Sequence, residues 1–325
     1  STEATDSDGV KTNDTTTNLT AYNISDTATR VIYNWLRNST IITILNMPFE
    51  NVSNTTTSTN AWDYSGLGNN GSIVVSFSSP AWDANGGYDN KGAYSFIGVG
   101  GGRIYINDSI HPSVKNICFD GCSFSMWVNK STASKASNYL ITRYDTTGDD
   151  RFFLMSASNI GAIQFDFGAN GGTTPSICST TAGDNSLPNE SWHHVVGRYN
   201  LTHLGIFVDG SAKASGACAF NNISVNSWQD DEPIGIGALG SGGTPWNGTI
   251  DEVTIWNRSL SSEQIQALYL NKTEVIVSQE TIRGENWTVI GYPNDGAQDG
   301  TLKVSNSVII LNGKKKIPIR NGIMA

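Results

Sequence analysis

The chain has 325 residues, enough for two or three domains of ordinary size. Only 15% of the residues are charged and 38% are hydrophobic, so most of the polar character comes from Asn, Thr, Ser and Gly. The net charge of −9 argues against nucleic acid and anionic membrane surfaces as partners, and no apolar run is long enough for a membrane-spanning helix. The chain begins without Met or a signal peptide, as expected of a mature chain or a fragment.

Glycosylation sequons are the strongest indication of the compartment. Sixteen Asn-x-Ser/Thr sequons occur, at Asn13, Asn18, Asn23, Asn38, Asn51, Asn54, Asn70, Asn107, Asn129, Asn189, Asn200, Asn222, Asn247, Asn257, Asn271 and Asn286. A chain rich in Asn and Thr forms some sequons by chance, but this density is several times what average usage gives. We therefore expect an exported protein that carries N-linked glycans at the cell surface or outside the cell. The combination of many sequons with few charges resembles archaeal surface proteins.

Four cysteines fit an oxidising compartment. Cys118 and Cys122 flank an Asp-Gly turn and are four residues apart, which favours a bridge between them and a second bridge from Cys178 to Cys218. Four cysteines allow three connectivities, and the sequence does not choose among them. A zinc site is the rival interpretation, but the chain has no CxxC and no pair of His at ligand spacing.

Short strands are predicted at both ends of the chain. After a polar segment at residues 1–17, strands are expected at 19–23, 30–36 and 40–45, and three more at 273–277, 286–292 and 302–311. Three short strands alone bury too little surface to be stable. We therefore predict one sandwich made of residues 1–46 and 272–313, with a domain inserted between them; three separate small modules are the alternative. The segment GENWTVIGYPNDGAQDGTLKVSNSVIIL (284–311) resembles the final two strands of immunoglobulin-like repeats of archaeal surface proteins. The segment RVIYNWLRNST (30–40) resembles first strands of the same repeat, in which Trp35 would take the core position.

The inserted region, residues 47–271, consists of many short strands separated by Gly-rich turns. Its last part, WNGTIDEVTIWNRSLSSEQIQALYLN (246–271), predicts a buried strand and a helix that begins with a capping box from Ser261 to Gln264, with Leu260 as a hydrophobic staple. This part resembles the closing strand and helix of laminin-G-like jelly-roll domains, in the concanavalin A-like lectin/glucanase superfamily. AWDYSGLGNNGS (61–72) and KGAYSFIGVGGGRIYI (91–106) resemble earlier motifs of that family. The predicted fold is all-β, a concanavalin A-like jelly-roll sandwich inserted into a smaller Ig-like β-sandwich.

The resemblance implies a structural calcium site. In that family the opening loop and the closing strand often hold a calcium ion together, which here predicts Asp63, Asn69 and Asp251 as ligands. Carboxylate and amide oxygens suit a hard cation. The alternative is that Asp63 makes an Asx-turn and that Asp251 caps a strand end.

Carbohydrate binding is the second expectation that the resemblance implies. Many relatives carry paired Asp after the equivalent of Phe96, whereas this chain continues with Ile97, Gly98 and Val99, so that acidic site is missing. Trp82, Trp228 and Trp246 are predicted to lie in loops, where they could stack on sugars. The alternative is that they close the ends of the sandwich.

Catalytic groups are not evident. No string of alternating acidic residues provides the two carboxylates that a glucanase needs, and the chain is predicted not to be an enzyme. His193 and His194 are neighbours in a strand and point to opposite faces, so they cannot chelate one metal together. His203, across a predicted hairpin, could approach one of them.

The segment 314–325 contains the one basic cluster, at Lys314, Lys315 and Lys316. It is either a linker or a donor strand, in which Ile317 and Ile319 would dock one face in a neighbouring copy. The leading hypothesis is a structural surface protein that assembles with copies of itself through its termini into an extracellular filament or coat. The alternative is a glycan-binding lectin or adhesin.

Overall fold

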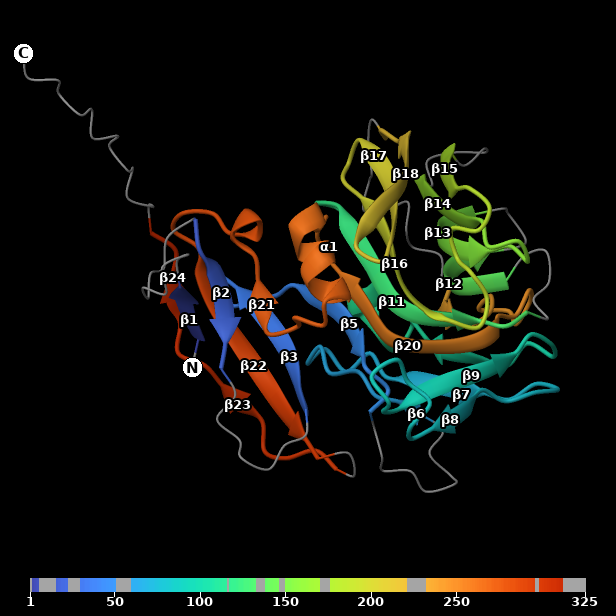
Figure 1. Ribbon diagram of the computed structural model, residues 1–325, viewed down its shortest axis with the longest axis horizontal. Coiled ribbons are helices and arrows are strands. Elements are labelled where there is room, and N and C mark those ends of the chain that lie inside the picture. The colour runs from blue at the N-terminus through green and yellow to red at the C-terminus, as the bar shows by residue number, and fades with distance from the viewer. Residues whose placement is uncertain are drawn as a thin grey trace, which may run out of the picture.

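A computed structural model describes residues 2–5, 16–22, 30–50, 60–115, 117–132, 138–145, 150–169, 176–220, 232–295 and 298–311. These residues form a large and a small β-sandwich, which lie side by side (Figure 1). Within this described part, α1 (Ser262–Tyr269) is the one α-helix, and no helix is long and apolar enough to cross a membrane. The 3-10 helices η1 (Pro112–Val114) and η3 (Ser278–Glu280) complete the helical elements described. The all-β fold class is confirmed.

The large sandwich has two eight-stranded sheets. The first has the order β18 (Ser211–Ala217), β17 (His203–Val208), β16 (Trp192–Tyr199), β11 (Cys122–Lys130), β20 (Asn247–Trp256), β9 (Ala93–Ile97) and β8 (Ala81–Asp83), with β5 (Thr43–Met47) also paired to β20. The second has the order β15 (Ser176–Ala182), β14 (Ile163–Ala169), β13 (Asp150–Ala157), β12 (Asn138–Asp145), β19 (Ile234–Ile236), β10 (Arg103–Ile106), β7 (Gly71–Val74) and β6 (Asn60–Ala61).

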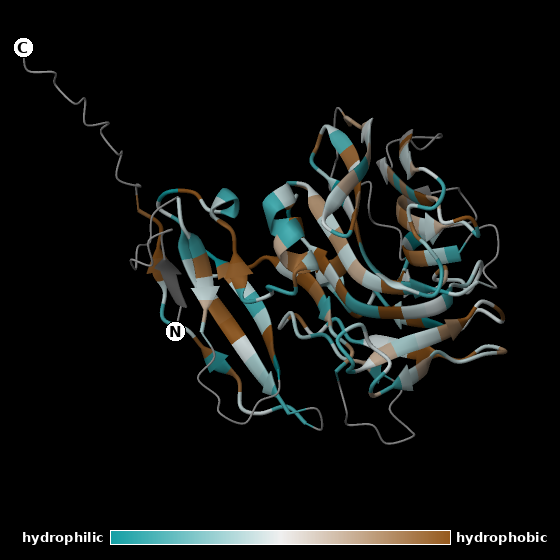
Figure 2. Ribbon diagram, in the orientation of Figure 1, coloured by the Kyte–Doolittle hydropathy of each residue, from teal (hydrophilic) through white to brown (hydrophobic). Residues whose placement is uncertain are grey.

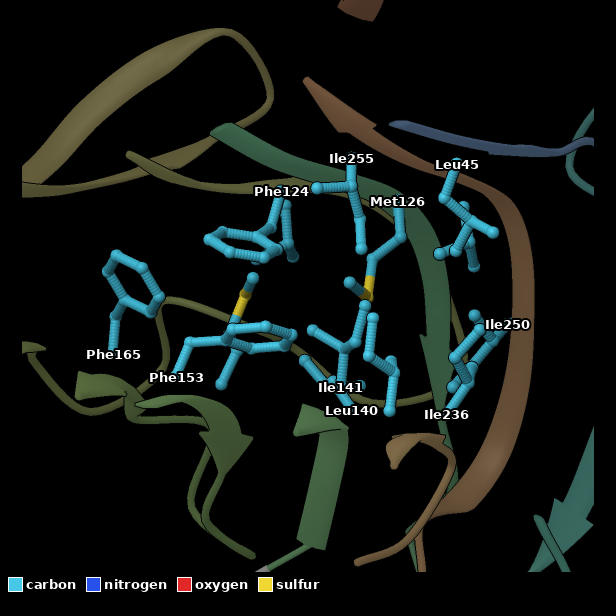
Figure 3. Close-up of a cluster of buried hydrophobic side chains, with 14 of the residues drawn as sticks. Leu45, Phe124, Met126, Leu140, Ile141, Phe153, Phe165, Ile236, Ile250 and Ile255 are labelled. Carbon is cyan, nitrogen blue, oxygen red and sulfur yellow. The ribbon is translucent and has the colours of Figure 1, made fainter. Parts of the chain in front are cut away.

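The core of the large sandwich lies between these sheets. Alternate residues of β11 point inward: Phe124 faces Phe153 and Phe165 of the opposite sheet, and Met126 faces Leu140 and Ile141 (Figure 3). The rings of Phe124 and Phe153 are 4.3 Å apart. This period of two is the pattern that one buried strand face requires.

A β-bulge interrupts the closing strand β20. Ser125 pairs with Thr254 and Trp127 with Asp251, so β20 has one residue more than β11 between these pairs. Glu252 takes the left-handed conformation at this point, with φ of 53°. Because the bulge absorbs the extra residue, Ile250 and Val253 both stay in the core while Asp251 and Glu252 lie outside it.

The small sandwich is built from both ends of the chain. One sheet contains β1 (Thr2–Thr5), β2 (Asn18–Ala21) and β21 (Val275–Ile276). The other contains β23 (Lys303–Val304), β22 (Asn286–Asn294), β3 (Arg30–Arg37), β4 (Thr40–Ile41) and β24 (Val308–Ile309). Strands 3 and 22 pair over eight residues, from Arg30 with Asn294 to Arg37 with Trp287. This pairing is the arrangement that the sequence indicates; the Ig-like assignment and the domain boundaries stay predictions.

One predicted strand of the small sandwich is corrected. The segment 40–45 does not form a single strand there, because Thr40 and Ile41 pair with β3 whereas Thr43–Met47 pair with β20 of the large sandwich. The chain therefore crosses between the sandwiches at Ile42, before the expected boundary at residue 46. In its place beside β20, every residue from Thr43 to Met47 is buried.

The two sandwiches share a hydrophobic cluster. Trp35 and Trp287 of the small sandwich meet edge to face at 6.4 Å, and their cluster also contains Phe207 of the large sandwich and Ile265 of α1. Figure 2 shows brown, hydrophobic segments on β22 and in the region around α1. The junction therefore has an apolar core of its own.

Candidate functional site

Two chain connections cross between the sheets at the same end of the large sandwich. Residues 75–80 join β7 to β8, and residues 98–102 join β9 to β10. The connections are hydrogen-bonded to each other: the Phe77 N–H donates to Gly100 O at 3.3 Å, and the Ser78 hydroxyl donates to Val99 O at 2.5 Å. In Figure 1 the chain beyond β7 and β9 projects from the large sandwich on the side away from the small one.

Glycine is required where these connections touch. Gly100 and Gly101 have φ of 74° and 71°, which disfavours any side chain. A Cβ on Gly101 would collide with the carbonyl of Gly242, and one on Gly102 with the carbonyl of Ser78. The backbones of three loops therefore pack directly on one another, which gives the connections a fixed shape.

Three apolar side chains on these connections, together with Ile97 at the end of β9, face solvent. Phe77 is 98% exposed, Val75 68%, Ile97 57% and Val99 48%. We call these four residues the apolar rim. No charged residue occurs in segments 75–82 or 97–102. Single exposed apolar residues are common, but four on or beside two paired, uncharged loops are a mark of an interaction surface.

A second candidate is a group of acidic residues at the junction of the sandwiches. Oxygens of Glu50, Asp89 and Glu252 all lie within 4.8 Å of one another. Arg30, the first residue of β3, forms ion pairs with all three, at 3.2 Å in the case of Asp89. We call these four residues the Arg30 cluster. Its side chains are between 2% and 14% exposed, so the charges interact with little screening by water.

Burial and mutual repulsion perturb these groups. Burial raises the pKa of Glu50 to about 7, although Arg30 opposes the shift. Burial likewise raises the pKa of Glu252 against the attraction of Arg30. For Arg30, burial alone would lower the pKa, but Glu252, Glu50 and Asp89 outweigh it and raise the pKa. One arginine thus faces more negative charge than it can neutralise.

Asp251 lies beside this cluster and fixes the loop between β8 and β9. Its carboxylate accepts hydrogen bonds from the N–H groups of Tyr88 at 3.1 Å and Glu252 at 2.8 Å. The Tyr88 ring stacks on Trp127 at 3.7 Å. Burial, followed by the charge of Glu252, raises the pKa of Asp251 well above its usual value.

Asp63 and Asn69 lie in a different network. Asp63 accepts hydrogen bonds from the N–H groups of Asn46, Ser65 and Asn69 and from the Ser65 hydroxyl, at 2.6–2.9 Å. Asn69 donates to Ile44 O and accepts from the Ser113 hydroxyl. Asp63 is thus the acceptor that organises its own loop, as in the Asx-turn alternative. The structure brings Asp63 and Asn69 together and gives Asp251 separate hydrogen-bond partners. Calcium binding at these three residues stays a prediction.

The histidines have structural partners. His193 Nε2 lies 2.9 Å from the Ser191 hydroxyl and His193 Nδ1 lies 2.8 Å from Asp209, while His203 is exposed and bonded to Thr202. The Asp209 N–H donates to His194 O, and the His194 N–H donates to the Asp209 carboxylate. These hydrogen bonds hold the turn between β17 and β18 against β16. The order Ser-His-Asp resembles a catalytic triad, but hydrolysis also needs oxyanion donors, and the neighbouring Glu190 N–H is already bonded to Lys130 O. Burial lowers the pKa of His194 to about 4.

The predicted sugar-stacking tryptophans are corrected in part. Trp246 is fully buried in the core of the large sandwich, so its proposed contact with a glycan is wrong. Trp82 is half-buried and donates its Nε1–H to Phe49 O at 2.8 Å. Trp228 lies outside the described residues, as do Ile317 and Ile319 of the proposed donor strand.

Both favoured disulfides are present, Cys118–Cys122 and Cys178–Cys218. Of the sequon asparagines, Asn13, Asn23, Asn51, Asn54 and Asn222 lie outside the described residues. The other sequon asparagines are exposed or half-buried, and none is buried. Their side chains are thus at the surface, while their occupancy by glycans stays a prediction.

Sequence reasoning missed the apolar rim and the Arg30 cluster. The available signal lies in the segment IGVGGG (97–102), where apolar residues stand in place of the acidic pair that many relatives carry. For Arg30 no local signal exists, because its partners are 20, 59 and 222 residues away in the chain.

Comparison with known proteins agrees with this fold. Residues 100–266 match the family model described as the concanavalin A-like lectin/glucanases superfamily. No curated protein matches the chain. Among solved structures, the binding domain of Paraclostridial mosquitocidal protein 1 is 14% identical with a TM-score of 0.50, over 70% of this chain and 51% of that one. The receptor binding domain of botulinum neurotoxin C/D mosaic serotype is 16% identical with a TM-score of 0.48, over 71% and 51%. The chain thus matches about half the length of these structures.

Proposed function

Because the chain belongs to the concanavalin A-like lectin/glucanases superfamily, we propose that it is a non-catalytic recognition module that binds a carbohydrate or a carbohydrate-bearing receptor outside the cell. Its superfamily includes both binding proteins and hydrolases, so the side chains of this chain must decide between the two activities. The fragment of Paraclostridial mosquitocidal protein 1 that has a similar fold is itself a binding domain.

The acidic residues favour binding over hydrolysis. A glycosidase needs two carboxylates on either side of an accessible glycosidic bond. Among the described residues, the one group of three acidic side chains whose oxygens lie within 4.8 Å of one another is that of Glu50, Asp89 and Glu252, which is buried and ion-paired to Arg30. These three carboxylates are therefore not available to a sugar.

The exposed aromatic ring of Phe77 carries the proposal. A ring that is 98% exposed can lie against the apolar face of a sugar or in a pocket of a receptor, and Val75, Ile97 and Val99 on the same part of the chain are also exposed. The loops beneath it are fixed by backbone packing, so little conformational freedom is lost on binding. The rim therefore has the anchor and the rigidity that a recognition surface needs.

The two disulfides and the glycosylation sequons fit an extracellular site of action. Two disulfides are stable in an oxidising environment and rare in the cytosol. The surface position of the described sequons allows glycans to be attached without disturbing the core.

Glycan-array and cell-binding measurements with the purified chain test this proposal. The variant is Phe77→Ser, and the matched control is Ile309→Ser, which removes an exposed apolar side chain (53% exposed) from the small sandwich. Losing the burial of a Phe, about 2 kcal/mol, should weaken binding roughly 10- to 100-fold without lowering the melting temperature. The control should bind like the wild type. Equal binding by all three proteins, or no binding to any glycan or cell, would refute the proposal.

Assembly with copies of itself is a second candidate function. The edge strands β23 and β24 expose Val304 and Ile309, and Leu311 follows β24; these three side chains are 52–60% exposed. An exposed apolar sheet edge can accept a further strand. Light scattering and electron microscopy of the full chain and of a truncation after residue 311 test this candidate: polymers that disappear on truncation support it, and monomers in both samples refute it.

A further inference from the structure

Arg30 and its three partners come from different sandwiches. Arg30 begins β3 of the small sandwich, whereas Glu50 follows β5, Asp89 lies between β8 and β9, and Glu252 is the bulge residue of β20. The ion pairs therefore join the two sandwiches next to their shared hydrophobic cluster. Glu50 is further held by the Gly92 N–H at 3.3 Å.

The carboxylates of Glu50, Asp89 and Glu252 lie so close together that a positive charge between them is stabilising. Three oxygens within 4.8 Å of one another repel strongly in a buried site unless positive charge lies between them. Here the planar guanidinium provides this charge, since its donors reach all three carboxylates at once. Lys91 adds a weaker attraction to Glu252 from the side of the loop.

Asp63 accepts a hydrogen bond from the Asn69 N–H, whereas Asp251 accepts hydrogen bonds from the N–H groups of Tyr88 and Glu252. The carboxylates that do converge are those around Arg30. We infer that Arg30 is a built-in cation, which fixes the small sandwich to the large one and makes a divalent ion unnecessary at this junction. Removal of Arg30 should then leave a latent divalent-cation site made by Glu50, Asp89 and Glu252.

Access to the cluster supports this inference. A small pocket between the sandwiches is lined by Arg30, Tyr33, Glu252 and Thr254, among others. Both Glu252 and Arg30 line this pocket, so in the wild type the positive charge of Arg30 opposes the entry of a cation.

Calorimetric titration with calcium chloride tests the inference on the full chain. The wild type should bind no calcium at this site and should have the same melting temperature in EDTA and in millimolar calcium. Arg30→Met should bind one calcium ion, with Kd of about 10⁻⁴–10⁻³ M, and calcium should raise its melting temperature. Arg37→Met is the matched control, because Arg37 lies on the same strand and pairs with the single carboxylate Glu285; it should bind no calcium.

Two outcomes would overturn the inference: calcium binding by the wild type with a raised melting temperature, or a folded Arg30→Met that binds none. If Arg30→Met is unfolded without calcium, the addition of calcium should restore its circular dichroism spectrum. If neither Arg30→Met nor Arg30→Gln folds under any condition, the wild-type comparison decides. Equal stability in EDTA and in calcium supports the built-in cation, and stabilisation by calcium overturns it.

Discussion

Replacing Glu50 by Gln should change how the stability of the protein depends on pH. Glu50 is buried against Arg30 and Gly92, and Gln keeps its shape and one acceptor oxygen. The variant removes a titrating group from the Arg30 cluster while disturbing the packing little.

The sign and size of the effect follow from the shifted pKa. Burial raises the pKa of Glu50 from 4.5 to about 7, so between these values the folded protein holds a proton that the unfolded chain has released. The stability contributed by this group is therefore present below pH 4.5 and is lost as the pH rises through about 7. One pKa unit corresponds to 1.36 kcal/mol, which makes the whole loss about 3 kcal/mol.

Urea unfolding at a series of pH values from about 4 to about 8 measures this loss. Relative to Glu50→Gln, the wild type should become less stable by about 3 kcal/mol across that range, because the other titrating groups largely cancel in the difference. Glu263→Gln, at an exposed position in the first turn of α1, is the control and should keep the wild-type slope. A difference between wild type and Glu50→Gln that does not vary with pH would refute the reasoning.

Two further predictions concern the large sandwich. Asp63→Ala should lower the free energy of unfolding by about 3 kcal/mol in urea, because three backbone N–H groups lose their acceptor; an unchanged midpoint would mean that the loop does not depend on this carboxylate. Replacing Cys178 and Cys218 by Ser should cost about 2 kcal/mol more than replacing Cys118 and Cys122, since the bridges close loops of 40 and 4 residues; denaturation of both double variants checks this order, and equal losses would contradict it.

The closing strand and helix were accessible to sequence reasoning because their signals are local. Ser261 caps α1 by accepting from the Gln264 N–H at 3.1 Å, as the capping box predicts. The Gln264 side chain, however, does not return to the cap. It bonds instead with Val275 O and the Val277 N–H, and so ties α1 to the strand that follows. The sequence shows the box, but tertiary packing decides what the glutamine contacts.

The candidate sites were not accessible in the same way. Phe77 looks like any core aromatic in the sequence, and it is exposed because two connections pack backbone to backbone beneath it. Trp246 shows the reverse: a tryptophan beside an Asn-Gly turn suggests a loop, yet it is completely buried. Exposure depends on which segments meet in space, and this information is not contained in a local pattern.

The way the small sandwich is closed determines which part of the molecule bears mechanical load. Tension along the chain enters at β2 and β3 and leaves at β21 and β22, and these strands are hydrogen-bonded to each other. The force is therefore carried by the ladder between β3 and β22, and the residues from β5 to α1 lie outside its path. The large sandwich, with the apolar rim at its far side, should therefore keep its shape while the small sandwich is under tension.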